Sequence, residues 1–385
     1  DWIGITGVIM TTRRGELSIR VDKWVRLAEA RRPFPDKWHG ITDTDTRYRQ
    51  RYVDLWVTPE ARKAFMIRSK MMSLTRRFLE ERGFIEVETP IFHPIPGGAN
   101  ARPFTTHHNA LDLELYMRVA PELYLKRLTV AGFDKVFELG RVFRNEGVST
   151  RHNPEFSMLE LYQAYADYED IMDLVEELVE YLAIELTGST VLHFGDQPLD
   201  VARPWRRASM IDLIEEATGE TLSVEMPIDE IRKVADKYGV PYRESYGVGK
   251  LVLEIYEKTT EANLWGPIYV TEHPSEVSPL ARDHRDKPGV TERFEAILAG
   301  RELCNAFSEL TDPEEQRRRF EAQAAQKADG DDEAMTVDED YLRALEYGMP
   351  PTGGLGIGMD RLAMLLTGVG TIRDVVLFPT LRPEK

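Results

Sequence analysis

Two strand-like segments near the middle of the chain carry charged and aromatic residues at alternating positions. The first contains Arg144 and Glu146, and the second contains Phe156, Glu160 and Tyr162. Because side chains alternate across a strand, a hairpin of these two segments would gather those residues on one surface. Charged groups are rarely buried without partners, so such a surface suits a binding site better than a core. The alternative is a network in which Arg144 is ion-paired with Glu146 or Glu160.

A second segment, residues 350–361, is rich in glycine and runs into a helix that begins near Asp360 and Arg361. Glycine inside an apolar strand often marks the close approach of a ligand or another backbone. A helix N-terminus favours an anion, and an arginine beside it adds a forked donor for phosphate. The segment is neither a Walker loop nor a spaced dinucleotide fingerprint. We therefore expect Arg361 to bind a phosphate; the alternative is a tightly packed strand with Arg361 paired to a carboxylate.

A third segment carries two glutamates on either side of a predicted turn at residues 299–300. A two-residue turn there places Ile297 opposite Glu302 and Glu295 opposite Cys304. Glu295 and Glu302 then project from the same face as diagonal neighbours. Two carboxylates on one face repel unless a cation lies between them, and magnesium is a simple explanation. The alternative is a pair of solvent-facing glutamates, each near an arginine.

Three more candidate positions, Asn305, Phe307 and Glu309, follow on the same strand but with the opposite parity to Glu302. All of them can line one pocket only if a β-bulge near Cys304 shifts the register. The sequence therefore predicts an irregular pairing at this point, provided that the strand serves a single site.

The elements that must position these residues are strands, several of which are joined without an intervening helix. Strand-like runs lie at 84–90, 113–119, 136–144, 156–162, 268–272, 293–299 and 302–309, and helices at 59–82, 121–130 and 168–186. Direct connections between strands favour antiparallel pairing over a doubly wound sheet. Residues 209–262 are predicted to be helical and to form an insertion.

Composition along the chain suggests three parts. Residues 1–30 contain strands too short to form a domain alone, and we expect them to be the end of a small β-barrel whose beginning lies upstream of Asp1. Residues 31–50 are charged, contain prolines and predict a linker. Residues 51–385 are long enough for one large domain.

Charge and cysteine content narrow the classes of protein. The net charge of −17 argues against a chain that binds nucleic acid over its whole surface, although basic runs at 13–14, 26–32 and 47–51 leave room for local contacts. The single cysteine excludes a disulfide within the chain and a zinc site built on several cysteines, and it indicates a reducing cytoplasm. We expect no membrane span, because no apolar run approaches the required length.

Taken in order, these segments resemble the three signature motifs of the class II aminoacyl-tRNA synthetases, and most closely the bacterial lysine-specific branch. The helix and strand that end at Pro90 resemble the first motif, residues 143–146 begin the second, and residues 356–361 form the third. The resemblance covers nearly the whole chain, with further family-like stretches at 96–99, 102–104, 108–112, 121–127, 152–156, 305–309 and 373–379. The family's N-terminal anticodon-binding barrel of OB type is represented only by residues 1–30.

The resemblance implies an α+β fold with an antiparallel sheet of six or more strands flanked by helices, and a homodimer formed through the first motif. It implies an ATP-dependent ligase of protein biosynthesis that converts L-lysine to lysyl-adenylate and transfers the lysyl group to tRNA(Lys). The family uses Mg²⁺, which Glu295 and Glu302 would hold.

The resemblance also implies catalytic roles for Arg144 and Arg361. Arg144 would bridge the α-phosphate of ATP and the carboxylate of lysine, and Arg361 would hold the far phosphate and cover the adenine. Phe156 would stack on the other face of the adenine, Glu146 would accept a hydrogen bond from its amino group, and His152 would lie near the phosphates. The implied ATP-binding residues are Arg144, Glu146, His152, Asn153, Phe156 and Arg361.

A second set of residues would bind lysine. Those implied for its α-ammonium and carboxylate groups are Glu122, the backbone of Gly98, and Asn305. Those implied for its ε-ammonium group are Glu160, Tyr162 and Glu309, and Phe307 completes the set. A buried ammonium group requires carboxylates nearby to offset its desolvation, so a lysine-shaped substrate is chemically sensible.

Two other functions share parts of this pattern. A lysyl-transferring paralogue would use a lipid (phosphatidylglycerol) or a protein as the acceptor, and the region upstream would distinguish it. A non-catalytic relative that senses amino acid or tRNA would have lost Arg144, Arg361 or the glutamate pair, and all of these are present. An aspartate-specific enzyme needs a cationic pocket, and Glu309 with Tyr162 indicates the opposite.

Overall fold

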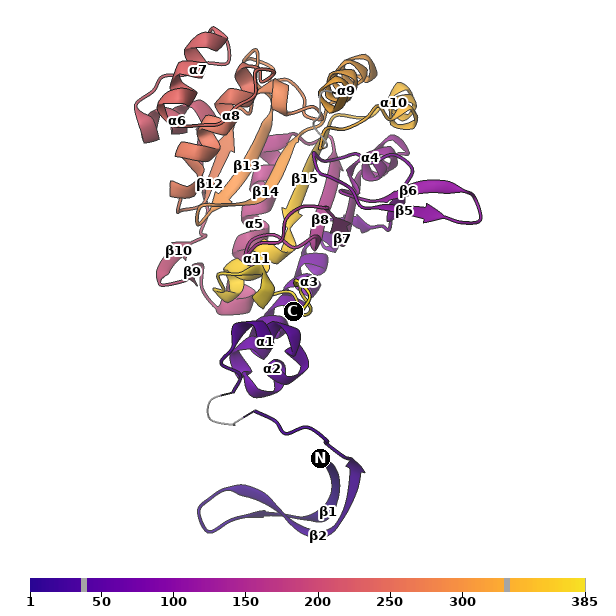
Figure 1. The fold of residues 1–385 in the computed structure, drawn as a ribbon, viewed down its shortest axis with the longest axis vertical. Helices are drawn as coiled ribbons and strands as arrows, with labels where there is room; N and C mark the ends of the chain where they lie inside the picture. Colours follow the sequence, from indigo (N-terminus) through magenta and orange to yellow (C-terminus); the bar gives the residue numbers. More distant parts are fainter. Residues whose placement is uncertain (36–39, 329–332, 385) are drawn as a thin grey trace. The chain divides into compact units, whose positions relative to one another are not determined.

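The computed structural model describes residues 1–35, 40–328 and 333–384, and it divides into two compact units, Asp1–Arg62 and Lys63–Lys385. Figure 1 shows the elements of both units. All of the candidate site residues belong to the second unit. No helix in the described ranges is long and apolar enough to span a membrane.

The first unit contains an antiparallel hairpin and two short helices. The hairpin pairs β1 (Trp2–Thr11) with β2 (Leu17–Ala28), and the helices are α1 (Thr44–Arg49) and α2 (Arg51–Val57). The strands predicted within residues 1–30 are present. Helix α1 lies within the predicted linker, of which residues 36–39 fall outside the described residues. The assignment of residues 1–30 to a barrel and of 31–50 to a linker stays a prediction.

An eight-stranded sheet forms the centre of the second unit, in the order β11-β12-β13-β14-β15-β8-β7-β3. The bounds along that order are Arg206–Ser209, Ile268–Thr271, Arg293–Leu298, Arg301–Ser308, Thr352–Gly358, Glu155–Ala164, Lys135–Phe143 and Ile85–Glu86. The strands from β12 to β7 are antiparallel, which confirms the predicted α+β architecture, whereas the edge pairs β11–β12 and β3–β7 are parallel and make the sheet mixed. Helices lie in both crossovers between the parallel neighbours, as such connections require.

Smaller strands and the helices complete this unit. The strands β4 (Phe92–His93), β5 (Thr105–His108) and β6 (Leu113–Met117) form a separate sheet, and β9 (Val191–Phe194) pairs with β10 (Gln197–Asp200). The helices are α3 (Pro59–Glu80), α4 (Glu122–Val130), α5 (Tyr168–Thr187), α6 (Met210–Thr218), α7 (Ile228–Lys237), α8 (Val248–Thr259), α9 (Pro313–Ala328), α10 (Glu339–Glu346) and α11 (Met359–Thr367). Short 3-10 helices are η1 (Glu261–Asn263), η2 (Ser275–Val277) and η3 (Ile372–Asp374). The strand predicted at 84–90 is reduced to β3, because only its first part pairs regularly with β7.

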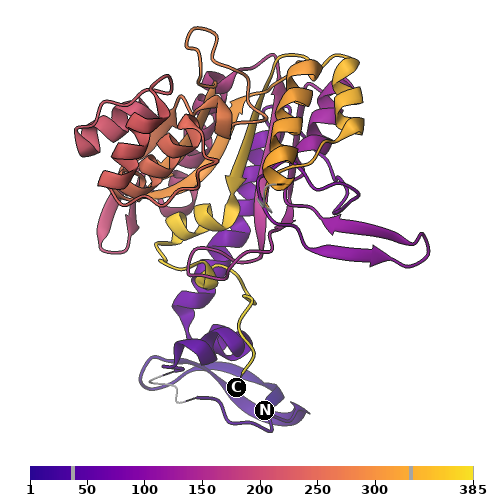
Figure 2. The same ribbon diagram turned by 45° about the horizontal axis from the view of Figure 1, so that its top comes forward.

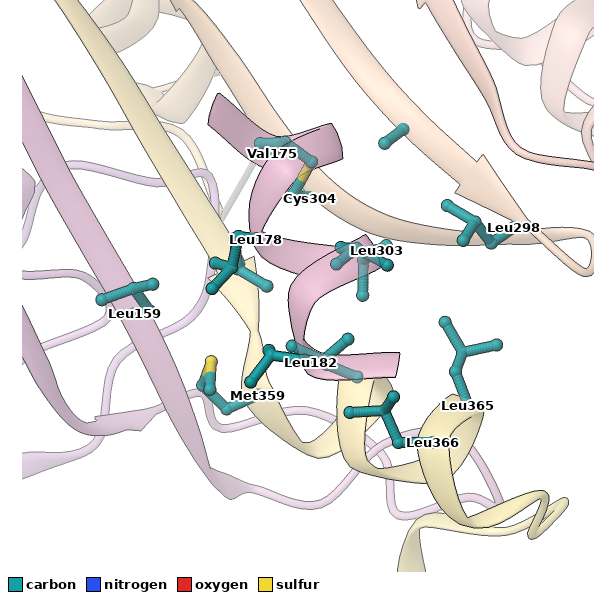
Figure 3. Close-up of a cluster of buried hydrophobic side chains, with 14 of the residues drawn as sticks. Leu159, Val175, Leu178, Leu182, Leu298, Leu303, Cys304, Met359, Leu365 and Leu366 are labelled. Carbon is teal, nitrogen blue, oxygen red and sulfur yellow. The ribbon is translucent and has the colours of Figure 1, made fainter. Parts of the chain in front are cut away.

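The main core lies between the sheet and the helices α5 and α11. Figure 3 shows Leu178 and Leu182 of α5 facing Leu303 and Cys304 of β14, with Met359 of α11 beside them. All five side chains are buried, and each fully buried leucine contributes roughly 1.5–3 kcal/mol of hydrophobic stabilisation. This core fixes β14 and the start of α11, both of which carry candidate site residues on the opposite side.

The helices α6, α7 and α8 form a separate cluster beside the β12 edge of the sheet (Figures 1 and 2). Their apolar faces bury Leu213, Ile231 and Leu251 against each other and against Val270 of β12. The predicted helical character of residues 209–262 is therefore confirmed, since their amphipathic pattern gives each helix one buried stripe. The β5–β6 hairpin extends away from the sheet on the other side in both views.

Candidate active site

A cavity of about 720 Å³ opens on the face of the sheet away from α5. Side chains from α4, β8, β13, β14 and β15 line it, together with the loop before β8 and the first turn of α11. Every residue that the sequence singled out contributes to its wall: Gly98, Glu122, Arg144, Glu146, His152, Asn153, Phe156, Glu160, Tyr162, Glu295, Glu302, Asn305, Phe307, Glu309 and Arg361. The fold thus brings together segments that are more than two hundred residues apart along the chain.

The turn of the β13–β14 hairpin has the predicted geometry. Ala299 and Gly300 both adopt a positive φ, at 53° and 64°, as a two-residue hairpin turn of this kind requires. Ile297 pairs with Glu302, which confirms the predicted pairing next to the turn. Glu302 therefore lies close to the turn and lines the cavity.

Beyond the turn, the register of the hairpin shifts between Ala296 and Ile297. The predicted pairing of Glu295 with Cys304 is therefore wrong, because Glu295 pairs with Asn305 and Cys304 pairs with Ala296. The irregularity that was predicted near Cys304 is present. A shift of this kind re-aims the side chains that follow it, and so the later residues of β14 reach the same cavity as Glu302.

Arg144 lies just after β7 at the centre of the cavity. Its Nε is buried and has no hydrogen-bond partner among the described residues, and its guanidinium lies 5.1 Å from the ring centroid of Phe156. Burial lowers the pKa of Arg144, while Glu146, Glu302 and Glu160 act in the opposite direction. No ion pair joins it to Glu146 or Glu160 in the described structure, so Arg144 lines the cavity with carboxylates near it but none in contact.

Arg361 projects from the first turn of α11 and is held by Glu302. Its Nη1 donates to Glu302 Oε2 at 2.9 Å and to the backbone oxygen of Glu302 at 2.7 Å. The alternative in which Arg361 pairs with a carboxylate is thus realised in this structure. The pair is formed by two residues of the cavity wall, so an anionic ligand can compete with Glu302 for the arginine.

Glu295 and Glu302 form the candidate cation site. Glu295 accepts a hydrogen bond from Arg293 Nη2 at 2.7 Å. Burial raises the pKa of Glu295 to about 7, with Arg293 opposing this and Glu302 adding to it. Burial also disfavours ionisation of Glu302, but the charge and hydrogen bond of Arg361 outweigh it and lower its pKa. Among the described residues no group of three or more potential metal ligands occurs.

The other end of the cavity is a slot lined by acidic groups, which we call the amine slot: Glu122, Glu160, Tyr162 and Glu309. Tyr162 donates to Glu160 Oε2 at 3.3 Å, and Glu309 Oε1 is buried without a hydrogen-bond partner in the described part of the chain. Burial raises the pKa of Glu160 and of Glu309 well above the usual value, and repulsion from the Glu122 carboxylate adds to this effect in both. The slot is therefore suited to a buried cation.

Gly354 of β15 leaves the space that this slot needs. A Cβ atom at this position would overlap Glu309 Oε1 and lie 2.7 Å from Tyr162 Cε1. The glycine of the strand therefore marks a close approach of other side chains, as the sequence pattern suggested.

The loop before β8 is held in place by its own side chains. His152 Nδ1 lies 3.0 Å from Ser149 Oγ, and burial lowers the pKa of His152. Asn153 donates to the backbone oxygen of Glu155 at 2.7 Å and accepts from the backbone N–H of Thr380 at 3.1 Å. Both ends of the Asn153 amide are thus engaged in fixing the loop.

Lys126 of α4 is a buried residue to which the sequence analysis gave no role. Its ammonium donates to Glu122 Oε1 at 2.5 Å and is ion-paired with Glu309. The spacing of four residues between Glu122 and Lys126 on a helix signals the first contact. The second contact joins residues far apart in the sequence, so no local pattern reveals it.

Comparison with known proteins matches residues 43–382 to the family of class II tRNA synthetases (D, K and N). The chain is 53% identical over 385 residues to the lysine–tRNA ligase of Carboxydothermus hydrogenoformans, covering 100% of this chain and 79% of that protein. It is 54% identical over 382 residues to the lysine–tRNA ligase of Shouchella clausii, and 53% identical over 382 residues to that of Bacillus subtilis. Those two matches cover 99% of this chain and 76% and 77% of the respective relatives.

Proposed function

Because this chain belongs to the class II tRNA synthetases of the D, K and N group, we propose that it activates L-lysine with ATP and transfers the lysyl group to tRNA(Lys). Relatives named as lysine–tRNA ligases are similar to it over essentially its whole length. The observation that carries the choice of amino acid is the amine slot, in which buried carboxylates lie in one cavity with Arg144 and Arg361. A buried cationic side chain requires such carboxylates.

In the proposed complex, ATP occupies the part of the cavity around the two arginines. Arg144 bridges the α-phosphate and the substrate carboxylate, and its buried Nε, which has no hydrogen-bond partner among the described residues, supports this role. Arg361 exchanges Glu302 for the far phosphate and covers one face of the adenine, while Phe156 stacks on the other face. Glu146 accepts from the adenine amino group. His152 lies at the rim of the phosphate site. Asn153 contributes to this rim by holding the loop in place.

Lysine occupies the remainder of the cavity. The backbone of Gly98, with Glu122, binds its α-ammonium group, and Asn305 binds its carboxylate. Phe307 packs against its aliphatic stem. The ε-ammonium is recognised by Glu160, Tyr162 and Glu309. The buried and unfilled acceptor of Glu309 supports this assignment, because such an atom gains most from a charged donor.

The chemistry in this proposal is an in-line substitution at phosphorus. An oxygen of the lysine carboxylate forms a bond to the α-phosphorus of ATP, and the bond from that phosphorus to the bridging oxygen breaks to release pyrophosphate. Arg144 stabilises the negative charge that spreads over the phosphoryl oxygens. The ribose hydroxyl at the 3′ end of tRNA then attacks the carbonyl of the adenylate, and AMP leaves. Positioning supplies much of the rate, and no covalent enzyme intermediate is needed.

Glu295 and Glu302 fit a Mg²⁺ ion that is completed by ATP. Magnesium is usually bound by one or two carboxylates together with substrate phosphates, and this cavity offers two carboxylates beside the phosphate-binding arginine. When bound, the ion would neutralise phosphate charge. Arg361, once it leaves Glu302 for a phosphate, frees that carboxylate for the cation.

Amino-acid-dependent exchange of pyrophosphate into ATP tests the first step. We expect L-lysine to drive the exchange and the other natural amino acids to drive it at least about a thousandfold less well, since a site built on buried polar groups rejects substrates that leave them unpaired. Charging of tRNA(Lys) with labelled lysine tests the second step. Exchange driven by a different amino acid would overturn the assignment of lysine as the substrate. Exchange without charging would overturn the assignment of tRNA(Lys) as the acceptor.

We also propose that the enzyme is a cytoplasmic homodimer assembled through α3 and the segment that follows it. Ile85, Ile91 and Phe92 lie in that segment and are 51%, 42% and 54% exposed, which is unusual for three large apolar side chains so close together. A second copy would cover them. Light scattering coupled to size-exclusion chromatography should give twice the mass of one chain, and Phe92→Asp should shift it towards that of one chain.

A further inference from the structure

The ammonium group of Lys126 lies behind the amine slot and is fully buried. It contacts two of the slot's carboxylates, those of Glu122 and Glu309. Its Nζ also lies 6.0 Å from the ring centroid of Tyr162 and 5.3 Å from that of Phe307, so aromatic faces enclose it. These neighbours come from α4, β8 and β14 and the residue that follows it, and so the lysine joins three parts of the cavity wall.

The charges of the slot match those of its proposed ligand only when Lys126 is counted. Three buried carboxylates, those of Glu122, Glu160 and Glu309, line the slot, and the one buried ammonium of Lys126 contacts the first and the last of them. Two negative charges therefore remain, and L-lysine brings two ammonium groups. The carboxylate of the substrate is matched separately by Arg144. A filled slot is then neutral, which avoids the large cost of an uncompensated charge in a water-excluded site.

We propose that Lys126 is a positioning residue that sets the charge of the amine slot and ties Glu122, at its α-ammonium end, to Glu309, at its ε-ammonium end. The inference rests on the proposed function, since it assigns the slot to lysine. Lys126 itself does not line the cavity and acts through the two glutamates. A single cation behind both carboxylates fixes their separation and leaves each with a free oxygen for the substrate.

The charge of Lys126 affects the pKa of the carboxyl groups in the slot. Burial already raises the pKa of Glu160 and of Glu309, so at low pH these carboxyl groups are protonated in the empty slot. The protons must then leave when lysine binds. Removal of the Lys126 charge would raise the pKa of the carboxyl groups further, because an opposite charge in contact favours the ionised form. The titratable groups that face Lys126 are Glu122 on α4, Glu309 after β14, Tyr162 on β8 and Tyr341 on α10. Glu160 is hydrogen-bonded to Tyr162, and the charges of Glu122, Arg144 and Arg118 also act on it: the first raises its pKa and the two arginines lower it.

The test compares Lys126→Met, which keeps the length of the side chain, with Lys126→Arg, which keeps the charge. The readout is the KM for L-lysine in pyrophosphate exchange between pH 5.5 and pH 9, measured with saturating ATP. For the parent, the KM should fall as pH rises and the slot loses protons. In Lys126→Met the midpoint of this fall should move by about one pH unit or more towards alkaline pH, and the KM at pH 7 should rise about tenfold or more. Lys126→Arg should keep the parental midpoint.

A residue that merely fills space would raise the KM by the same factor at every pH, and a parental midpoint in Lys126→Met would overturn the proposal. The double variant Lys126→Met/Glu309→Gln restores the charge of the slot, so its midpoint should return to within about half a pH unit of the parent. If the single variant does not fold, the double variant is compared with Glu309→Gln, from which it differs only at Lys126. Loss of the Lys126 charge should then move the midpoint towards alkaline pH, and identical midpoints in these two variants would overturn the proposal. Absence of lysine-dependent exchange in the parent would instead refute the proposed function.

Discussion

Arg68, in the long helix α3, is ion-paired with Asp360, the residue next to Arg361, which we propose binds a phosphate. Asp360 is 2% exposed and also accepts a hydrogen bond from the backbone N–H of Ser157 at 2.8 Å. Arg68 in turn donates to Ser157 Oγ at 3.0 Å. The first turn of α11 is thus tied both to α3 and to the strand that carries Phe156. The buried carboxylate of Asp360 therefore positions both Phe156 and Arg361, which we propose enclose the adenine.

The variant Arg68→Met should destabilise the protein and weaken ATP binding. Removal of one partner leaves the carboxylate of Asp360 buried with only the Ser157 N–H, which costs about 2–4 kcal/mol in free energy of unfolding. Urea titration measures this cost, and exchange kinetics should show a higher KM for ATP than for lysine relative to the parent. The matched control is Arg76→Met, also on α3, which breaks an exposed pair with Glu86 and should cost less than about 1 kcal/mol. Equal costs for the two variants would contradict this account.

The variant Gly354→Ala should fill the amine slot. The added methyl group would overlap Glu309 and crowd Tyr162, so the KM for lysine should rise about tenfold or more while the KM for ATP changes little. Pyrophosphate exchange at varied lysine and varied ATP separates the two constants. Gly266→Ala is the control, because nothing lies within 4 Å of a Cβ at that position. A KM for lysine that stays parental in Gly354→Ala would show that the slot is not where lysine binds.

The variants Glu309→Gln and Arg361→Ala should affect different substrates. Loss of the Glu309 charge removes one of the two buried carboxylates, Glu160 and Glu309, that we propose for the ε-ammonium group. The apparent free energy of lysine binding, taken from the KM, should therefore weaken by about 2–4 kcal/mol. Loss of Arg361 should mainly raise the KM for ATP and lower kcat. The exposed Arg317, paired with Glu339, serves as a control in Arg317→Ala. Small and equal effects of the first two variants on both substrates would count against the assigned roles.

The affinity for lysine should still increase with pH at values above the usual pKa of a glutamate side chain. Burial raises the pKa of Glu160 and of Glu309, so in the empty protein these groups hold protons at a pH at which an exposed glutamate has lost its own. A cationic ligand favours the ionised form, so binding releases protons, and linkage then requires affinity to rise with pH. Calorimetric titration of lysine in buffers of different ionisation enthalpy measures the release. Net proton uptake between pH 5.5 and pH 7.5 would reverse the predicted sign.

Cys304 should be unreactive in the folded protein. It is 1% exposed in the core beneath the cavity, and burial raises the pKa of its thiol. Thiolates react much faster than thiols, so a thiol-specific reagent should modify the native chain slowly and the urea-unfolded chain at once. Spectrophotometric titration in parallel samples measures both rates. Rapid reaction without denaturant would show that the sheet opens around β14.

Much of the molecule could be predicted from local patterns. Alternation of side chains located the central strands, amphipathic spacing located helices such as α5, and the motif-like segments supplied every residue of the cavity wall that we assigned. These features are encoded within stretches of about ten residues, where periodicity and turn residues act directly on the backbone. The pairing of Ile297 with Glu302 is an example, because the adjacent turn fixes it.

The three-dimensional fold decided which groups share a contact. The sequence predicted that Glu295 and Glu302 lie near a turn and that the pairing is irregular near Cys304, but only the structure showed that Glu295 pairs with Asn305. The contact of Lys126 with Glu309 and that of Arg68 with Asp360 join distant segments. Their formation depends on how layers pack, since burial forces each charged group to find a partner wherever the fold places one. Local sequence specifies which groups need partners, and tertiary packing chooses them.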